Sequence, residues 1–286
     1  MRLGKEGRVK GYGGGITAGK VAGWVKKGHG QGSGKSYSPW IMARDISSTG
    51  LTTREKGWKT GRVHHVLSNH ELHYLYLLEW SPIVLDIREQ YPLLPLAKTI
   101  GIANRLGIRH PVDTKTQEPI VMTTDFLLDV TERDHVRLKA RTVKPEQKLS
   151  SSFRVVEKFE IERVYWQERG IDWGIVTEKE IPEALARNVE FLHAAKDITS
   201  MPGLGPSDFL VVEPVLFDLI NDQKEPLAKA ALAADEKLGL SGGTSLRMIK
   251  CLLANRLWLT NMEKPIDTAR PLRACRAGMV MEVEAS

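Results

Sequence analysis

The chain has 286 residues, of which 42% are hydrophobic and 27% are charged. A chain of this length forms one large domain or two ordinary ones, and its composition excludes bulk disorder. It has no apolar run of roughly 18 residues that could span a membrane, and no apolar stretch typical of a secretory signal, so we expect no membrane partner. Cys251 and Cys275 are too far apart in the sequence to suggest a disulfide framework, which favours the reducing cytoplasm.

The positive charge is concentrated at the N-terminus. Residues 1–62 contain 13 Lys and Arg against 3 Asp and Glu, a balance of +10, whereas the remaining residues contain 28 against 32, a balance of −4. A cationic arm on a nearly neutral body suits a polyanion such as DNA, and counterion release would make that binding weaken with salt. A solubilising tail is the alternative that charge alone leaves open.

The same arm is rich in glycine. Residues 1–36 hold 12 of the 25 glycines, which predicts loose structure there. Over residues 37–62 we expect an arm with isolated apolar anchors, among them Tyr37 and Trp40.

Four histidines lie close together just beyond the arm: His64, His65, His70 and His73. Zinc sites need four ligands, and no cysteine or matching pair of residues completes such a set. We therefore interpret these histidines as polar residues near the start of a helix.

The first folded segment begins at Ser68. Ser68 and Glu71 fit the S-x-x-E capping box, and the apolar spacing that follows predicts a helix over 69–80. The later elements expected in this segment are a strand at 82–93, a helix at 96–106, strands at 120–130 and 135–143 joined by a turn at 131–134, a helix at 148–167 and a strand at 171–176. This order predicts an α/β fold with a mixed sheet covered by helices.

The second segment begins near Thr177 and is mainly helical. The helices that we expect lie at 180–195, after Ser207, at 226–239 and at 244–259. A glycine turn at 241–243 gives the last two the spacing of a helix-turn-helix. Residues 260–284 are a candidate for a small wing, with Val280 and Met281 in its returning strand.

Three residues of the first segment are candidates for phosphodiester hydrolysis, which needs a divalent cation, an attacking water and groups that offset charge on the phosphate. Asp125 lies in an apolar strand, where a buried acid is costly without a partner such as a metal. Lys144 follows the next strand and would share a sheet end with Asp125 if the two strands form a hairpin. Glu71 is available as a second carboxylate.

Each candidate also has a purely structural alternative. Glu71 fits the capping box, Asp125 fits an acid that accepts backbone hydrogen bonds at a strand end, and Lys144 fits a solvated loop lysine. The spacing of the three residues does not decide between these roles.

Seven blocks of sequence, taken in order, indicate a family. These blocks are 68–72, 78–82, 86–93, 123–127, 143–145, 162–166 and 173–178. Together they resemble the TnsA endonucleases of heteromeric cut-and-paste bacterial transposons, closely over about residues 65–180 and loosely beyond.

The resemblance implies a fold and a site. It implies a nuclease domain like that of restriction endonucleases over 63–177 and a winged-helix domain over 178–286. The basic arm over 1–62 follows from the charge distribution instead, and its glycine-rich part has no counterpart in the family. It also implies that Glu71 and Asp125 bind Mg²⁺ together with the carbonyl of Val143, that Mn²⁺ can substitute, and that Lys144 is the active-site lysine. Thr142 stands where the family usually has Gln or Glu, so a role for this side chain in metal binding stays open.

The resemblance also implies a role and partners. TnsA-like proteins cut double-stranded DNA at the 5′ ends of the element, a TnsB-like transposase cuts and joins the 3′ ends, and the C-terminal domain contacts a TnsC-like ATPase regulator. The alternatives are a stand-alone restriction or repair nuclease and an inactive DNA-bound assembly subunit. For the helix predicted over 244–259, docking of a protein is favoured over reading of DNA, because this segment lacks the positive excess of the arm.

Overall fold

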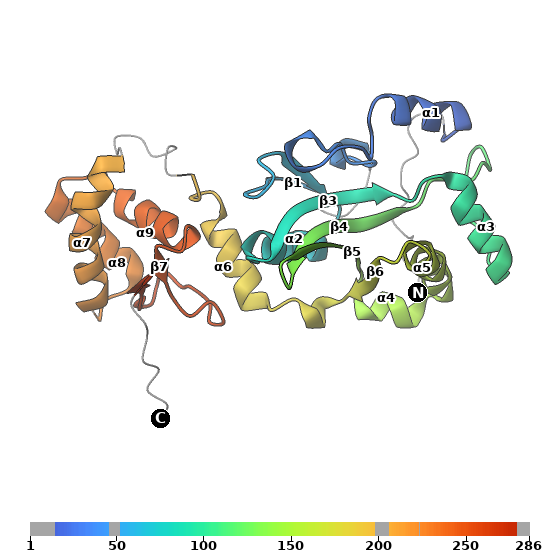
Figure 1. Ribbon diagram of the computed structural model, residues 1–286. Coiled ribbons are helices and arrows are strands. Elements are labelled where there is room, and N and C mark those ends of the chain that lie inside the picture. The colour runs from blue at the N-terminus through green and yellow to red at the C-terminus, as the bar shows by residue number, and fades with distance from the viewer. Residues whose placement is uncertain (1–14, 46–51, 198–205, 223, 279–286) are drawn as a thin grey trace. The chain divides into compact units, whose positions relative to one another are not determined.

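The computed structural model describes residues 15–45, 52–197, 206–222 and 224–278 (Figure 1). The chain divides into two compact units, Met1–Ile181 and Pro182–Ser286, which are described separately here. No helix within the described residues is long and apolar enough to cross a bilayer.

A four-stranded mixed sheet forms the centre of the first unit (Figure 1). Its strands lie in the order β3 (Val84–Pro92), β4 (Thr123–Glu132), β5 (His135–Val143) and β6 (Asp172–Val176). The first three are antiparallel neighbours, whereas β6 runs parallel to β5. The four strands and the mixed sheet were predicted from the sequence and are confirmed.

The turn between β4 and β5 is a two-residue hairpin. Arg133 and Asp134 have positive φ angles of 46° and 65°. Two positive φ angles give a turn whose twist matches that of the flanking strands, so it closes the hairpin tightly. The turn aligns Phe126 with Arg141, which brings the beginning of β4 beside the end of β5.

Helices cover both faces of this sheet. On one face, Leu127 of the sheet packs in a buried cluster with Ile102 of α3 (Leu96–Leu106) and Ile161 of α5 (Phe153–Gln167). On the other face lies α2 (Asn69–Trp80), where the ring of Tyr74 is 5.5 Å from that of Phe126. The bounds predicted for α2 and α3 are confirmed.

The helix predicted over 148–167 is wrong as a single element. It is divided into α4 (Glu146–Ser151) and α5, because Ser152 adopts an extended conformation with φ −139° and ψ 100°. Gly170 follows α5 with a φ of 65°, as expected for a residue that ends a helical stretch.

Residues 15–45 are ordered, so the prediction of loose structure over 1–36 is wrong for 15–36, whereas residues 1–14 lie outside the described part. The segment forms α1 (Ala18–Lys26), the short 3₁₀ turns η1 (Gly34–Ser36) and η2 (Ala43–Asp45), and a hairpin of β1 (Thr53–Lys56) with β2 (Val63–Val66). Aromatic burial explains the order: Tyr37 and Trp40 are 4% and 2% exposed. These two predicted anchors are confirmed.

The second unit is built from helices and one short ribbon. Its elements are α6 (Glu183–His193), α7 (Pro206–Asp222), α8 (Leu227–Leu238), α9 (Thr244–Ala254), β7 (Trp258–Leu259) and β8 (Cys275–Arg276). The helix predicted over 180–195 begins later, because the capping box at Thr177 closes the 3₁₀ turn η3 (Glu178–Glu180) and Pro182 then precedes α6.

The turn between α8 and α9 is fixed by a buried carboxylate. Asp235 accepts hydrogen bonds from the N–H groups of Gly243 at 2.6 Å and Ser245 at 2.7 Å. Gly239 ends α8 in the left-handed conformation, which glycine adopts without strain. The predicted helix–glycine turn–helix arrangement is confirmed.

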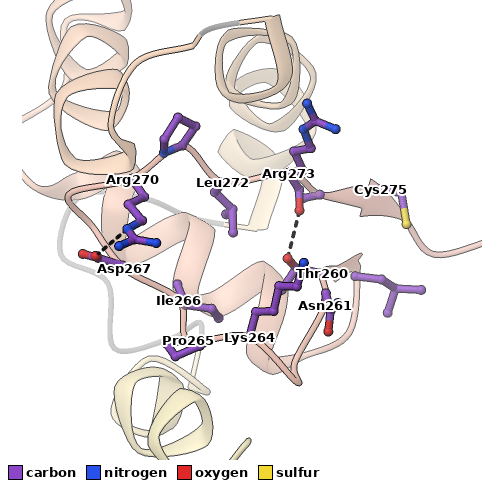
Figure 2. A pocket seen from close by; sticks show the side chains of 13 residues that line it. Thr260, Asn261, Lys264, Pro265, Ile266, Asp267, Arg270, Leu272, Arg273 and Cys275 are labelled. Carbon is purple, nitrogen blue, oxygen red and sulfur yellow. Dashed lines mark hydrogen bonds and ion pairs between the residues drawn. The ribbon is translucent and has the colours of Figure 1, made fainter. Parts of the chain in front are cut away.

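The last predicted helix is too long. α9 ends at Ala254, because Arg256 has a φ of 56° and Trp258 enters the ribbon with β8. The returning strand is at Cys275–Arg276, whereas the expected positions Val280 and Met281 lie outside the described residues. The loop between β7 and β8 surrounds a hollow of about 890 Å³, across which Thr260 donates a hydrogen bond to the Arg273 carbonyl (Figure 2).

Candidate active site

Glu71 is held at the N-terminus of α2. The Ser68 hydroxyl accepts a hydrogen bond from the Glu71 N–H at 3.2 Å, as the predicted cap requires. The Glu71 carboxylate accepts hydrogen bonds from the Ser68 hydroxyl at 3.0 Å and from the Leu67 N–H at 2.9 Å. Burial, together with the negative charge of Asp125, raises the pKa of Glu71 to about 8.

Asp125 lies in β4 beside the end of β5. Its Oδ2 accepts a hydrogen bond of 2.8 Å from the N–H of Val143, as expected for a strand-end acid. Burial raises the pKa of Asp125 to about 6, although the hydrogen bond from Val143 and the charge of Lys144 oppose this shift. The carboxyl is therefore close to the sheet end that the sequence predicted.

β4 changes face at Asp125. Residues two apart in a regular strand lie on the same face of a sheet. Here Thr124 accepts a hydrogen bond of 2.7 Å from the indole of Trp166 on α5, whereas Phe126 contacts Tyr74 of α2 on the opposite face. Asp125 therefore lies between one residue that contacts α5 and one that contacts α2.

Gln90 joins the two carboxylates. Its amide Nε2 lies 3.4 Å from Oε2 of Glu71 and 3.5 Å from Oδ1 of Asp125, which is long for hydrogen bonds. Its Oε1 accepts a hydrogen bond of 3.3 Å from the hydroxyl of Thr123. One side chain therefore reaches both acids.

Lys144 completes the group. It directly follows β5, and its N–H donates to the Val176 carbonyl of β6 at 2.9 Å. Burial raises the pKa of both carboxyls, and the nearby positive charge of Lys144 acts in the opposite direction. Glu71, Asp125 and Lys144, three residues that sequence reasoning selected, are thus within electrostatic reach of one another.

Comparison with known proteins places the chain in a family. Residues 81–178 match the model of the TnsA-like endonuclease N terminal domain, and residues 180–262 match that of the TnsA endonuclease C terminal domain. The transposon Tn7 transposition protein TnsA of Escherichia coli is 38% identical over 261 residues, which cover 91% of this chain and 92% of that protein. The chain belongs to the TnsA endonuclease family. It is therefore a DNA endonuclease of transposition.

The donor set in this TnsA-family site fits a hard divalent cation. Carboxylate oxygens are preferred ligands of Mg²⁺, and a cation between Glu71 and Asp125 would offset the repulsion between the two acids. Within the described residues there is no group of three or more His, Cys, Asp and Glu side chains placed to hold a metal. A cation here would therefore need further oxygens from the backbone, an amide or water.

His64 is not one of the polar helix-start residues that we expected. It lies in β2 and is fully buried, with Nδ1 2.8 Å from Oε2 of Glu89 and Nε2 2.8 Å from the Thr60 hydroxyl. Glu89 also binds the guanidinium of Arg62 with both carboxylate oxygens. Although burial alone would raise the pKa of Glu89, the hydrogen bonds from Arg62 and His64 lower it to about 2.

Sequence reasoning missed a third carboxylate close to this TnsA-family site. Glu162 of α5 is 2% exposed, and its Oε1 accepts hydrogen bonds from Thr142, from Thr124 at 2.7 Å and from Trp173 at 3.0 Å. Burial raises the pKa of Glu162 to about 7. The sequence did contain a sign that Glu162 is buried. Glu162 lies four residues before Trp166, which puts both residues on the same, apolar side of the helix.

Proposed function

We propose that this endonuclease cuts the 5′ ends of a transposon by Mg²⁺-dependent hydrolysis at the site formed by Glu71, Asp125 and Lys144. The observation that carries the proposal is the pair of buried carboxylates that one amide reaches, with a lysine charge nearby. Buried acids without a cation are costly, which is why a metal is the chemistry that this pair favours.

Each residue has a distinct role in this proposal. Glu71 and Asp125 supply one ligand each, and the carbonyl of Val143 supplies another, since its N–H already fixes the Asp125 carboxylate. When bound there, Mg²⁺, or Mn²⁺ in its place, would supply Lewis-acid polarisation of the phosphate and a water of lowered pKa. Lys144 orients the attacking water and offsets charge that develops on the phosphate.

We further propose a division of labour along the chain. The arm over 1–62 adds DNA affinity, since Lys26, Lys27 and Lys35 are exposed. Residues 63–177 form the restriction-endonuclease-like domain, and residues 178–286 form a winged-helix domain that docks a TnsC-like ATPase. Docking rather than DNA reading is supported by α9, which is buried along most of its length and whose Lys250 lies 3.6 Å from the ring of Phe191.

A cleavage assay tests the site. We expect the chain, assembled with a TnsB-like transposase and a TnsC-like ATPase on transposon ends with Mg²⁺, to nick the 5′ ends. Asp125→Ala and Lys144→Ala should each abolish 5′ cleavage and leave 3′ joining intact, because the partner does that chemistry. Lys148→Ala, which removes an exposed lysine four residues further along the chain, is the matched control. If both active-site variants still cut the 5′ ends, the assignment is wrong.

The same assay separates the alternatives. A stand-alone nuclease of the restriction or repair type would cut duplex DNA without partners. An inactive assembly subunit would leave the 5′ ends uncut even in the wild-type complex. Our proposal places the reaction on nucleoid DNA in the bacterial cytoplasm and requires cleavage only in the assembled complex.

A further inference from the structure

Gln90 adopts a backbone conformation that costs free energy. Its φ is +49°, in the left-handed region that residues with a Cβ atom avoid. It is 2% exposed, and its amide lies between two buried acids. Strain of this kind persists only where the surroundings impose it, and such residues concentrate at functional sites.

The Gln90 amide lies close enough to both acids to share a cation with them. Adjacent oxygens around an octahedral Mg²⁺ are about 3 Å apart, given metal–oxygen distances of about 2.1 Å. The terminal amide atom of Gln90 is 3.4 and 3.5 Å from the oxygens of Glu71 and Asp125. Without a cation, the NH₂ group faces these acids because it can donate to both.

A half-turn of the amide would exchange its two ends, giving up the two long hydrogen bonds to the acids, which coordination to a bound cation would replace. Its oxygen would then face the acids, and its NH₂ group would face Thr123. The Thr123 hydroxyl donates to Gln90 at 3.3 Å and can accept equally well, since a hydroxyl does both. Gln90 can therefore present nitrogen to the bare acids and oxygen to a cation.

The glycine-rich segment holds Gln90 from outside. Residues 30–40 double back on themselves, with the Gly30 N–H donating to the Ser38 carbonyl at 2.6 Å. The Trp40 N–H then donates to the Gln90 carbonyl at 3.2 Å, and the Tyr37 hydroxyl donates to the Glu89 carbonyl at 3.0 Å. The strained residue and its predecessor are thus both fixed by this segment.

Gly30 allows the close approach that this contact needs. Its φ is +73°, and a Cβ atom there would lie 2.2 Å from Cγ of Pro92, two residues beyond Gln90. Gly28 has a similar φ of +83°, but a Cβ atom there would meet nothing within 4 Å. The two glycines share the backbone requirement and differ only in the contact with β3.

We propose that Gln90 supplies a further oxygen ligand, beside the Val143 carbonyl, to the cation bound by Glu71 and Asp125, and that residues 30–40 position it. The inference rests on the proposed function, since it takes those two acids as the metal site. It makes the glycine-rich segment part of the active site as well as part of a DNA-binding arm.

Terbium luminescence tests this on the full chain without any cleavage, because Tb³⁺ is a hard cation that prefers oxygen ligands. Gln90→Gly keeps the left-handed backbone free of strain and removes only the side chain. We expect it to unfold no earlier than wild type and to bind Tb³⁺ ten- to a hundredfold more weakly, as loss of a supporting residue usually does. Unchanged affinity would overturn the proposal.

Gln90→Glu distinguishes a ligand from a hydrogen-bond clamp. If Gln90 is a ligand, the Gln90→Glu protein should bind Tb³⁺ at least as tightly as wild type, because a carboxylate is also a ligand. If Gln90 only donates hydrogen bonds to the two acids, a glutamate in its place would repel them. Weaker Tb³⁺ binding would therefore refute the ligand role.

Paired glycine variants test the segment. Gly30→Ala should weaken Tb³⁺ binding about tenfold, whereas Gly28→Ala should leave it unchanged. If Gly30→Ala does not fold, Tyr37→Phe decides, because it removes only the hydroxyl that holds Glu89. If Gly30→Ala, or Tyr37→Phe where Gly30→Ala does not fold, binds Tb³⁺ as tightly as wild type, residues 30–40 do not position Gln90. Asp125→Ala is the reference: if it leaves Tb³⁺ binding intact, the proposed metal site itself fails, whatever the other variants do.

Discussion

Glu71→Gln should stabilise the metal-free protein at alkaline pH, although it removes a residue that we assign to the active site. The variant keeps the shape of the side chain and removes its charge. The amide oxygen can accept from the Leu67 N–H and from the Gln90 amide, and the NH₂ group can donate to the Ser68 hydroxyl, so all three contacts of the carboxylate remain satisfiable. The difference between the two proteins is therefore the cost of ionising Glu71.

The magnitude follows from the pKa of Glu71. Its usual value of 4.5 is raised to about 8, chiefly by burial and then by Asp125. At about 1.4 kcal/mol per pKa unit, the shift sets an upper bound of about 5 kcal/mol, and we expect about 2–3 kcal/mol after relaxation and water entry. Because the folded pKa is raised, the cost is absent below pH 4.5, grows as pH rises to about 8 and is constant above.

Urea unfolding measured at pH 5 and pH 9 with chelator provides the assay. Tryptophan fluorescence reports the first unit, since all tryptophans except Trp258 precede residue 182. We expect nearly equal midpoints for wild type and Glu71→Gln at pH 5, and a higher midpoint for the variant at pH 9. A variant that is equally destabilised at both values would refute the reasoning, because it would show that Glu71 is ionised in the fold at no cost.

Three further predictions concern other parts of the chain. Glu89→Gln should lower the free energy of unfolding by about 3–5 kcal/mol in urea, because it leaves a buried guanidinium without its anion; a change below 1 kcal/mol would contradict this. Asp134→Gly should raise that free energy by about 0.5–1 kcal/mol by relieving the positive φ, whereas a loss would show that the aspartate itself stabilises the turn. Lys26→Ala combined with Lys27→Ala should reduce the salt slope of DNA binding by about 2 in fluorescence anisotropy; an unchanged slope would exclude phosphate contacts.

Much of the first unit could be predicted because its local signals agree. The capping box at Ser68 gives the start of α2, and strand-like composition bounded by turn signals gives β3 to β5. The break at Ser152 was missed although serine favours helix N-caps, the position that Ser152 occupies before α5. The early end of α9 could not be predicted, because Arg256, which adopts a left-handed φ, carries no turn signal.

The candidate site was predictable in part for the same reason. Asp125 stands out as an acid in an apolar strand, and hairpin pairing places Lys144 near it. Gln90 gives no such sign, because its role depends on a left-handed φ and on two partners distant in the sequence. The glycine-rich segment misled us, since its composition is typical of a linker, yet Trp40 and Tyr37 fix it to β3.

The docking of residues 30–40 along β3 bears on how shortened versions of this endonuclease should be designed. Judged by composition, residues 1–36 form a loose tail. Removing residues 1–40 would take the hydrogen bonds of Tyr37 and Trp40 from the strand that carries Gln90 and leave the Arg62–Glu89 pair in place, so we expect such a protein to fold and yet be inactive. Trimming that stops before Gly15 keeps the contacts of residues 30–40 with β3. If a protein truncated beyond these residues is inactive, the loss of these contacts explains it, and the result gives no information on DNA binding by the N-terminal arm.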